Sequence, residues 1–141
     1  MNANKRSAAG QMQRVDEEEL DWDDDVSVLN GVPFNGIGVM YYPDGSVEGE
    51  SAYVDGFKEG LVKEWHSNGK LRTEWFAERG RAKGKVTEWH PNGTVKSVGT
   101  YEFGAELRYE EWDELGNQVE FREIDEASEL FEYVVQMRTT A

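Results

Sequence analysis

The two histidines are the residues whose type and spacing most directly suggest chemistry. His66 and His90 are the only histidines among 141 residues, and each has a glutamate two positions before it, Glu64 and Glu88. Imidazole nitrogens and carboxylate oxygens bind zinc and other divalent ions. Two such pairs on neighbouring hairpins are the basis for one alternative, a metal-dependent enzyme. A sequence repeat would also place these residues alike, so we expect neither a metal nor another cofactor.

Other catalytic arrangements are weakly represented. Neighbouring carboxylates such as Glu110 and Glu111 are residues that general acid–base catalysis uses. However, Ser67, Ser97 and Ser128 lack the glycine-flanked elbow of an activated serine, and the chain has no P-loop or dinucleotide fingerprint. The absence of cysteine excludes disulfides and cysteine-based sites. We therefore predict that the protein is not an enzyme.

The chain repeats itself every 24 residues between Gly36 and Gly104, in copies that occupy 36–59, 60–83 and 84–107. Each copy has an Asp-Gly or Asn-Gly pair between two alternating apolar runs, which predicts a tight hairpin with positive φ at both turn residues. Second turns at 55–56, 79–80 and 103–104 would link the hairpins. The sequence predicts a mostly β fold, an extended twisted antiparallel meander of β-hairpin repeats with one C-terminal helix.

The repeat divides the chain into one domain with two different ends. We expect a disordered tail over 1–13 and a single repeat domain over 14–141, with an acidic segment at 14–25 and a first strand and turn at 26–35. A degenerate repeat over 108–124 and a helix over 126–138 complete the domain. The expected strands lie near 37–42, 46–54, 59–66, 70–78, 84–90, 94–102, 107–112 and 118–124.

Both ends should pack on the repeats. In the acidic segment, Leu20 and Trp22 are expected to act as apolar anchors. The C-terminal helix should begin after an Asp125 N-cap and cover the edge or face of the last hairpin. Its predicted apolar face consists of Ala127, Leu130, Phe131 and Val134.

Aromatic residues recur at one position of the repeat. Tyr41, Trp65 and Trp89 should form a ladder on one face of the sheet, because strand side chains alternate between faces. Tyr42, His66 and His90 would then lie on the other face. Stacked copies can share a core that no single copy has. The aromatic side chains are also candidates for contact with a partner protein, the set being Trp65, Trp75, Trp89 and Tyr101.

The formal charge of −14 is concentrated at the two ends of the repeats. Residues 16–25 hold eight acids and no base, and residues 102–132 hold twelve acids and two bases, whereas 26–101 hold nine of each. This charge would repel nucleic acid and anionic membranes and attract a basic partner. The residues of the acidic ends that we expect to contact such a partner are Trp22, Asp23, Asp24 and Asp25, together with Glu110 and Glu111. The alternative is that these acids only keep the protein soluble.

Targeting signals and membrane segments are not evident in the sequence. No apolar h-region occurs near the start and no run approaches about 20 apolar residues. We expect a cytoplasmic protein of undetermined oligomeric state.

The motif Gly-x-x-x-Glu-Trp-His-x-Asn-Gly-x-(Leu/Val)-(Lys/Arg) in the second and third copies resembles the bacterial MORN-repeat variant family, of the kind known as YwqK-type antitoxins. The resemblance covers roughly residues 14–138 and is strongest over 30–116. It implies a noncatalytic antitoxin or immunity protein that neutralises a partner toxin by occluding its active or substrate-binding surface. A toxin with a basic cleft would suit the acidic flanks. The alternative is a MORN-like scaffold that mediates protein or lipid association.

Overall fold

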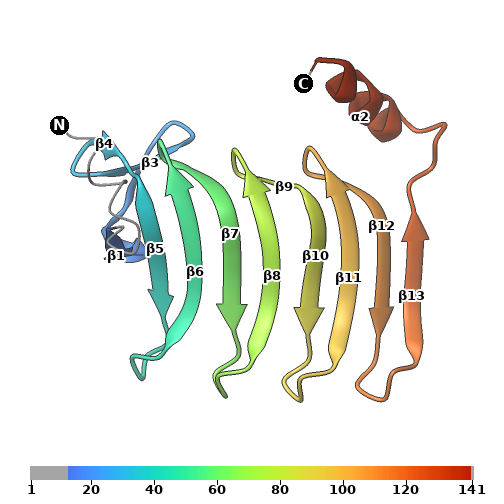
Figure 1. Cartoon of the computed structure of the whole chain (residues 1–141), viewed down its shortest axis with the longest axis horizontal. Helices are drawn as coiled ribbons and strands as arrows, with labels where there is room; N and C mark the ends of the chain where they lie inside the picture. Colours follow the sequence, from blue (N-terminus) through green and yellow to red (C-terminus); the bar gives the residue numbers. More distant parts are fainter. Residues whose placement is uncertain (1–12, 141) are drawn as a thin grey trace.

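A single long sheet of hairpins makes up most of the computed structural model, which describes residues 13–140 (Figure 1). Its strand order is β1-β5-β6-β7-β8-β10-β11-β12-β13, with the short β9 paired to β8. All neighbours are antiparallel except β1 and β5, which run parallel. The predicted fold class, a long antiparallel sheet of hairpin repeats with one C-terminal helix, is confirmed.

The strands of the four hairpins fall close to the predicted ranges, whereas no strand is predicted at β1 or β9. The strands of the long sheet are β1 (Arg14–Asp16), β5 (Gly36–Tyr41), β6 (Val47–Val54), β7 (Phe57–Trp65), β8 (Leu71–Glu78), β9 (Arg81–Ala82), β10 (Gly84–Trp89), β11 (Val95–Glu102), β12 (Ala105–Trp112) and β13 (Gln118–Glu123). Trp112 follows Trp89 by 23 residues rather than 24. The two tryptophans nevertheless end equivalent strands, and both follow a register shift. The degenerate repeat is therefore a fourth hairpin of the same kind.

The N-terminal end of the sheet contains much of the buried core. A small sheet of β2 (Asp21–Asp23), β3 (Val26–Leu29) and β4 (Val32–Pro33) lies there, after the 3-10 helix η1 (Glu17–Glu19). Phe34 is 2% exposed and meets the Tyr53 ring edge-on at 5.5 Å between centroids. Burial, and after it the neighbouring Glu17 carboxylate, raise the pKa of Tyr53 well above its usual range.

The acidic segment is tied to this end by its backbone and not by Trp22. The indole of Trp22 is 75% exposed, so its prediction as an anchor is wrong, whereas Leu20 is half-buried. Strand β1 instead pairs with β5, and the carbonyl of Gln13 accepts a hydrogen bond from Ile37 N at 2.8 Å. The predicted disordered tail lies outside the described residues over 1–12, but Gln13 is bonded to the sheet.

The turns within the hairpins do not have their expected geometry, which the linking turns between hairpins adopt instead. Asp44, Asn68 and Asn92 do not have positive φ; each accepts a hydrogen bond to its side chain from the backbone N–H two residues on, and only the glycine that follows is left-handed. These are three-residue loops closed by a glycine bulge. The two-residue turns with positive φ at both positions are the linking turns, at 55–56, 79–80 and 103–104. The prediction was wrong because side-chain bonding by Asp and Asn competes with the left-handed conformation.

The C-terminal helix α2 (Glu129–Thr140) begins three residues later than predicted. Ser128 is its N-cap, since its hydroxyl accepts from Phe131 N at 3.1 Å, while Asp125 closes the preceding turn by accepting from Ala127 N. Val134 is fully buried and Phe131 is half-buried. Ala127 and Leu130 are exposed, so their predicted place in the packed face is wrong.

The helix does not cover the edge of the last hairpin. It lies beyond the strand ends near the β11–β12 turn (Figure 1). There the guanidinium of Arg138 donates to both carboxylate oxygens of Glu102, at 2.8 and 2.9 Å, and these bonds lower the pKa of Glu102. Tyr133 bonds the carbonyl of Phe103 at 3.3 Å and receives a bond from Arg81 at 3.2 Å. The helix therefore fastens turns of the sheet, because its polar side chains reach them and its apolar face is narrow.

The linking turns allow a direct test of how the small N-terminal sheet is docked. Gly56 and Gly80 both have φ near +80°. The N–H of each donates to a carbonyl of the segment before its own repeat, that of Phe34 for Gly56 and that of Lys58 for Gly80. A Cβ at Gly56 would lie 2.2 Å from Val26 Cγ1 and 2.7 Å from the Ser27 carbonyl, whereas one at Gly80 meets nothing within 4 Å. Each Gly→Ala change costs about 1–2 kcal/mol for the left-handed backbone. We expect Gly56→Ala to cost roughly 1–3 kcal/mol more in urea unfolding; equal losses would contradict the docking.

Candidate functional site

The two histidines are joined to the backbone of the next repeat. Nε2 of His66 lies 2.8 Å from the Trp89 carbonyl oxygen, and Nε2 of His90 lies 2.8 Å from that of Trp112. A carbonyl only accepts, so Nε2 carries the hydrogen in both rings. Tyr42 holds the same position in the first repeat, and its hydroxyl donates to the Trp65 carbonyl at 2.5 Å. The three bonds form a series, here called the carbonyl ladder, that runs from each hairpin to the next.

The histidines and glutamates do not form a metal site. Within residues 13–140, no three His, Cys, Asp or Glu side chains gather in a group that could hold a metal ion. Glu64 instead accepts a hydrogen bond from Arg72 at 3.1 Å, and Glu88 accepts one from Ser97 at 2.7 Å. A signal for the carbonyl ladder is present in the sequence. Tyr42, His66 and His90 occupy one repeat position, and each has a ring with a hydrogen-bond donor at its tip.

Four of the predicted contact residues lie on opposite faces of the sheet. Trp75 is paired with Val62, and Tyr101 with Gly84. Side chains alternate between faces along a strand, and paired residues on neighbouring strands point to the same face. By this rule Trp75 and Tyr101 lie on one face of the sheet, and Trp65 and Trp89 lie on the other. The structure therefore does not bring the predicted set together on one surface.

The face with Trp65 and Trp89 carries a continuous apolar row. At the end of each hairpin an aromatic residue pairs with an aliphatic one: Tyr41 with Val47, Trp65 with Leu71 and Trp89 with Val95. Trp112 extends the series on β12. We call these residues the aromatic row. Tyr41 and Val95 are exposed and the other members are half-buried. The predicted alignment of Tyr41, Trp65 and Trp89 on consecutive hairpins is confirmed, and four further residues join it.

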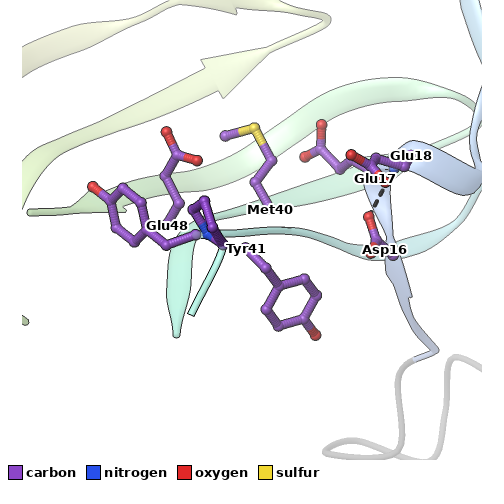
Figure 2. Close-up of a pocket in the computed structure, with 8 residues that line it drawn as sticks. Asp16, Glu17, Glu18, Met40, Tyr41 and Glu48 are labelled. Atoms are coloured by element: carbon purple, nitrogen blue, oxygen red, sulfur yellow. Dashed lines mark hydrogen bonds between the residues drawn. The ribbon is translucent and has the colours of Figure 1, made fainter. Parts of the chain in front are cut away.

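Two pockets lie at the ends of the aromatic row, one with acidic residues in its lining and one that is mainly apolar. Beside Tyr41 is a pocket of about 540 Å³ whose lining includes four acids, Asp16, Glu17, Glu18 and Glu48. Figure 2 shows that Met40 and Tyr41 leave β5 on opposite sides, with Glu48 on the side of Met40, so this pocket wraps around the strand.

The second pocket, of about 470 Å³, is mainly apolar. It is lined by Val95, Val98, Trp112 and Leu115, together with turn residues, and Leu115 is 88% exposed. Sequence reasoning did not identify either pocket, because each brings together residues from separate hairpins or from η1.

Of the predicted acidic residues, Glu110 shares a face with the aromatic row, two residues before Trp112 on β12, and the others lie away from the row. Asp23, Asp24 and Asp25 are exposed with Trp22 in the small N-terminal sheet. At the other end, consecutive residues Glu110 and Glu111 lie on opposite faces of β12. Glu110 accepts from Gln118 at 3.1 Å and Glu111 accepts from Tyr109 at 2.8 Å.

The C-terminal acids are partly neutralised by arginine. The guanidinium of Arg122 donates to Glu106 at 2.9 and 3.0 Å, and these bonds lower the pKa of Glu106. Arg108 bonds Glu123 at 3.1 Å. The exposed aspartates of the β2–β3 turn make none of the ion pairs found within residues 13–140. The N-terminal acids are therefore the less neutralised of the two groups.

The hairpins coincide with segments of known type. Residues 34–55, 58–77 and 83–102 match the model of the MORN repeat variant family. The chain carries MORN repeat variants. The matched segments are the hairpins β5–β6, β7–β8 and β10–β11, and the fourth hairpin lies outside them. No curated protein and no solved structure matches the chain. The match identifies the repeat and names no activity or partner.

Replacement of His66 tests the carbonyl ladder that joins the MORN repeats. His66→Phe removes the donor to the Trp89 carbonyl and should lower the free energy of unfolding by about 0.5–1.5 kcal/mol. His66→Tyr supplies a hydroxyl, as Tyr42 does in the first repeat, and should retain most of that stability. Urea unfolding monitored by circular dichroism measures both. If the two variants are equally stable, the bond does not contribute.

Proposed function

We propose that the protein is a noncatalytic binding protein that recognises a partner protein through the aromatic row. The observation that carries this proposal is the row itself, which crosses seven strands from β5 to β12 on a face of the sheet that no second layer covers within residues 13–140. Six steps of about 4.8 Å give it a length of roughly 29 Å. Tryptophan and tyrosine contribute most to protein interfaces, since a rigid ring has a large contact area and little rotamer entropy to lose.

The charges around the row favour a basic partner. The acidic pocket lies at the Tyr41 end and the apolar pocket lies at the Trp112 end. A partner segment across the row would therefore place cationic side chains near Asp16, which pairs with Val39 on the Tyr41 face, and apolar side chains near Leu115. The exposed aspartates of the small sheet extend the negative field beyond the row.

Neutralisation of a toxin is the finer form of this proposal. It rests on the resemblance of the repeats to those of bacterial antitoxins and on the negative field, which suits an enzyme with a basic cleft. Occupation of such a cleft would occlude the substrate. We place this role in the cytoplasm; no helix of the described chain is long and apolar enough to cross a bilayer.

The second candidate function is a scaffold that assembles proteins or lipid. The long sheet of repeats favours it, because such surfaces are extended and largely uncovered. The net charge of −14 disfavours anionic lipid. Sedimentation with phosphatidylserine vesicles separates the two functions: the protein should stay in the supernatant, and co-sedimentation would support the scaffold.

Substitution in the aromatic row tests the proposed binding surface. The product of the neighbouring gene is co-expressed with the protein in a bacterial host, and both growth and complex formation are measured. Trp65→Ala and Trp89→Ala should each weaken the complex by about tenfold or more, as expected of interface tryptophans. Trp75→Ala is the matched control, since it removes an equally half-buried indole from the opposite face. Equal weakening by all three would contradict the row, and growth unaffected by the neighbour would contradict the toxin.

Reversal of the exposed aspartates tests the contribution of charge. The association rate of the complex should fall several-fold between low and physiological salt, because screening shortens the range of the field. A variant with Asp23, Asp24 and Asp25 all changed to Lys should associate more slowly and depend less on salt. Stopped-flow tryptophan fluorescence measures both rates. A salt-independent rate would show that these acids only solubilise the protein.

A further inference from the structure

Strand β13 is an uncovered edge of the sheet. Among residues 13–140, it pairs only with β12, and Figure 1 shows no strand beyond it and α2 displaced past the strand ends. Two apolar side chains on it are exposed, Val119 at 55% and Phe121 at 47%. An edge of this kind presents unpaired backbone groups that can bind another strand.

The backbone groups that point outward can be identified. Ile124 N donates to the Leu107 carbonyl on β12 at 2.9 Å, so Ile124 faces inward. In an antiparallel pair the residues alternate between inward-facing and outward-facing backbone groups. Glu120 and Arg122 therefore bond to β12, and Phe121 and Glu123 direct their N–H and C=O groups away from the sheet.

We propose that β13 pairs antiparallel with β13 of a second copy of this chain, about a two-fold axis at Phe121. The two Phe121 residues exchange backbone hydrogen bonds and their rings face each other. Arg122 of each copy lies opposite Glu120 of the other copy, where their side chains can form an ion pair. Within one chain these two side chains already lie on the same face of the sheet, at 3.3 Å from each other. The two sheets become one, and the two aromatic rows are related by the same axis.

The charges on β13 select this register. A shift that centres the axis on Glu120 places two carboxylates opposite each other, and one that centres it on Arg122 places two guanidinium groups opposite each other. Like charges directly opposite on paired strands are unfavourable. Only the Phe121-centred register of these three pairs opposite charges and also matches the outward-facing backbone groups.

Sedimentation equilibrium of the full chain over a range of concentrations tests the proposal. The wild-type protein should show a monomer–dimer equilibrium. Phe121→Lys places two ammonium groups at the axis and should raise the dimer dissociation constant about tenfold or more. Phe76→Lys is the matched control, because Phe76 is 44% exposed on the same face but lies on the interior strand β8, and it should leave the constant within about twofold.

A charge reversal separates specific pairing from general repulsion. Glu120→Lys makes the net charge less negative by two units, which favours association in general, but it places Lys opposite Arg122 and should weaken the dimer. Asp25→Lys makes the same change of charge in the small N-terminal sheet and should leave the dimer intact or strengthen it. Unchanged circular dichroism and thermal midpoint show that each variant folds. A monomer at every concentration, or a dimer that both β13 variants leave intact, would overturn the proposal.

Discussion

The hydrogen bonds between consecutive hairpins are the interaction on which this structure depends. A sheet with no second layer cannot hold its units together by burial alone, because half of each strand surface stays near water. The carbonyl ladder joins the hairpins at one end, through Tyr42, His66 and His90. At the other end, N–H groups of the linking glycines bond the preceding unit, as Gly56 N does with the Phe34 carbonyl at 2.8 Å. Both sets connect each hairpin to its neighbour, and the carbonyl ladder is kept even between His90 and Trp112, where the repeat is one residue shorter.

Burial is consequently concentrated where the repeats end. Phe34, Tyr53 and Val28 make a compact core under the small N-terminal sheet, and β1 covers the first edge of the long sheet. At the C-terminal end, α2 contributes the buried Val134 and a guanidinium on Glu102. It fastens the turns and leaves β13 uncovered. The two ends differ because the first is closed by backbone pairing and the second by side chains that reach the turns.

The sequence predicts the features that the 24-residue repeat determines, which are the hairpins and the aromatic row. It does not predict pairings with segments that lie outside the repeat. Gly36, Gly60 and Gly84 are enough to define the hairpins, and Tyr41, Trp65 and Trp89 locate the aromatic row. The parallel pairing of β1 with β5 was not predictable, since no local pattern links Arg14 to Ile37. Side-chain alternation along the strands places Trp75 and Trp65 on opposite faces of the sheet, and this alternation can be read from the sequence. The prediction of one contact surface is wrong because it takes the exposure of each tryptophan from its residue type alone. The same error made Trp22 an anchor, because an aromatic residue in a three-residue strand has few neighbours to cover it.

At one position of the repeat, the backbone carbonyl supports the fold and the side chain contributes to the surface. At Trp65, Trp89 and Trp112 the backbone carbonyl accepts the hydrogen bond of the carbonyl ladder, while the indole lies in the aromatic row. A change of side chain there leaves the carbonyl in place, whereas a change at Tyr42, His66 or His90 removes the donor. The ladder therefore restricts the residue after Tyr41, Trp65 and Trp89 to one with a donor at the tip of its ring. The aromatic residue itself is restricted only by its half-buried neighbours on the sheet. This freedom lets the surface vary along the row, from Tyr41 beside acids to Trp112 beside Leu115, without loss of the bonds that define the fold.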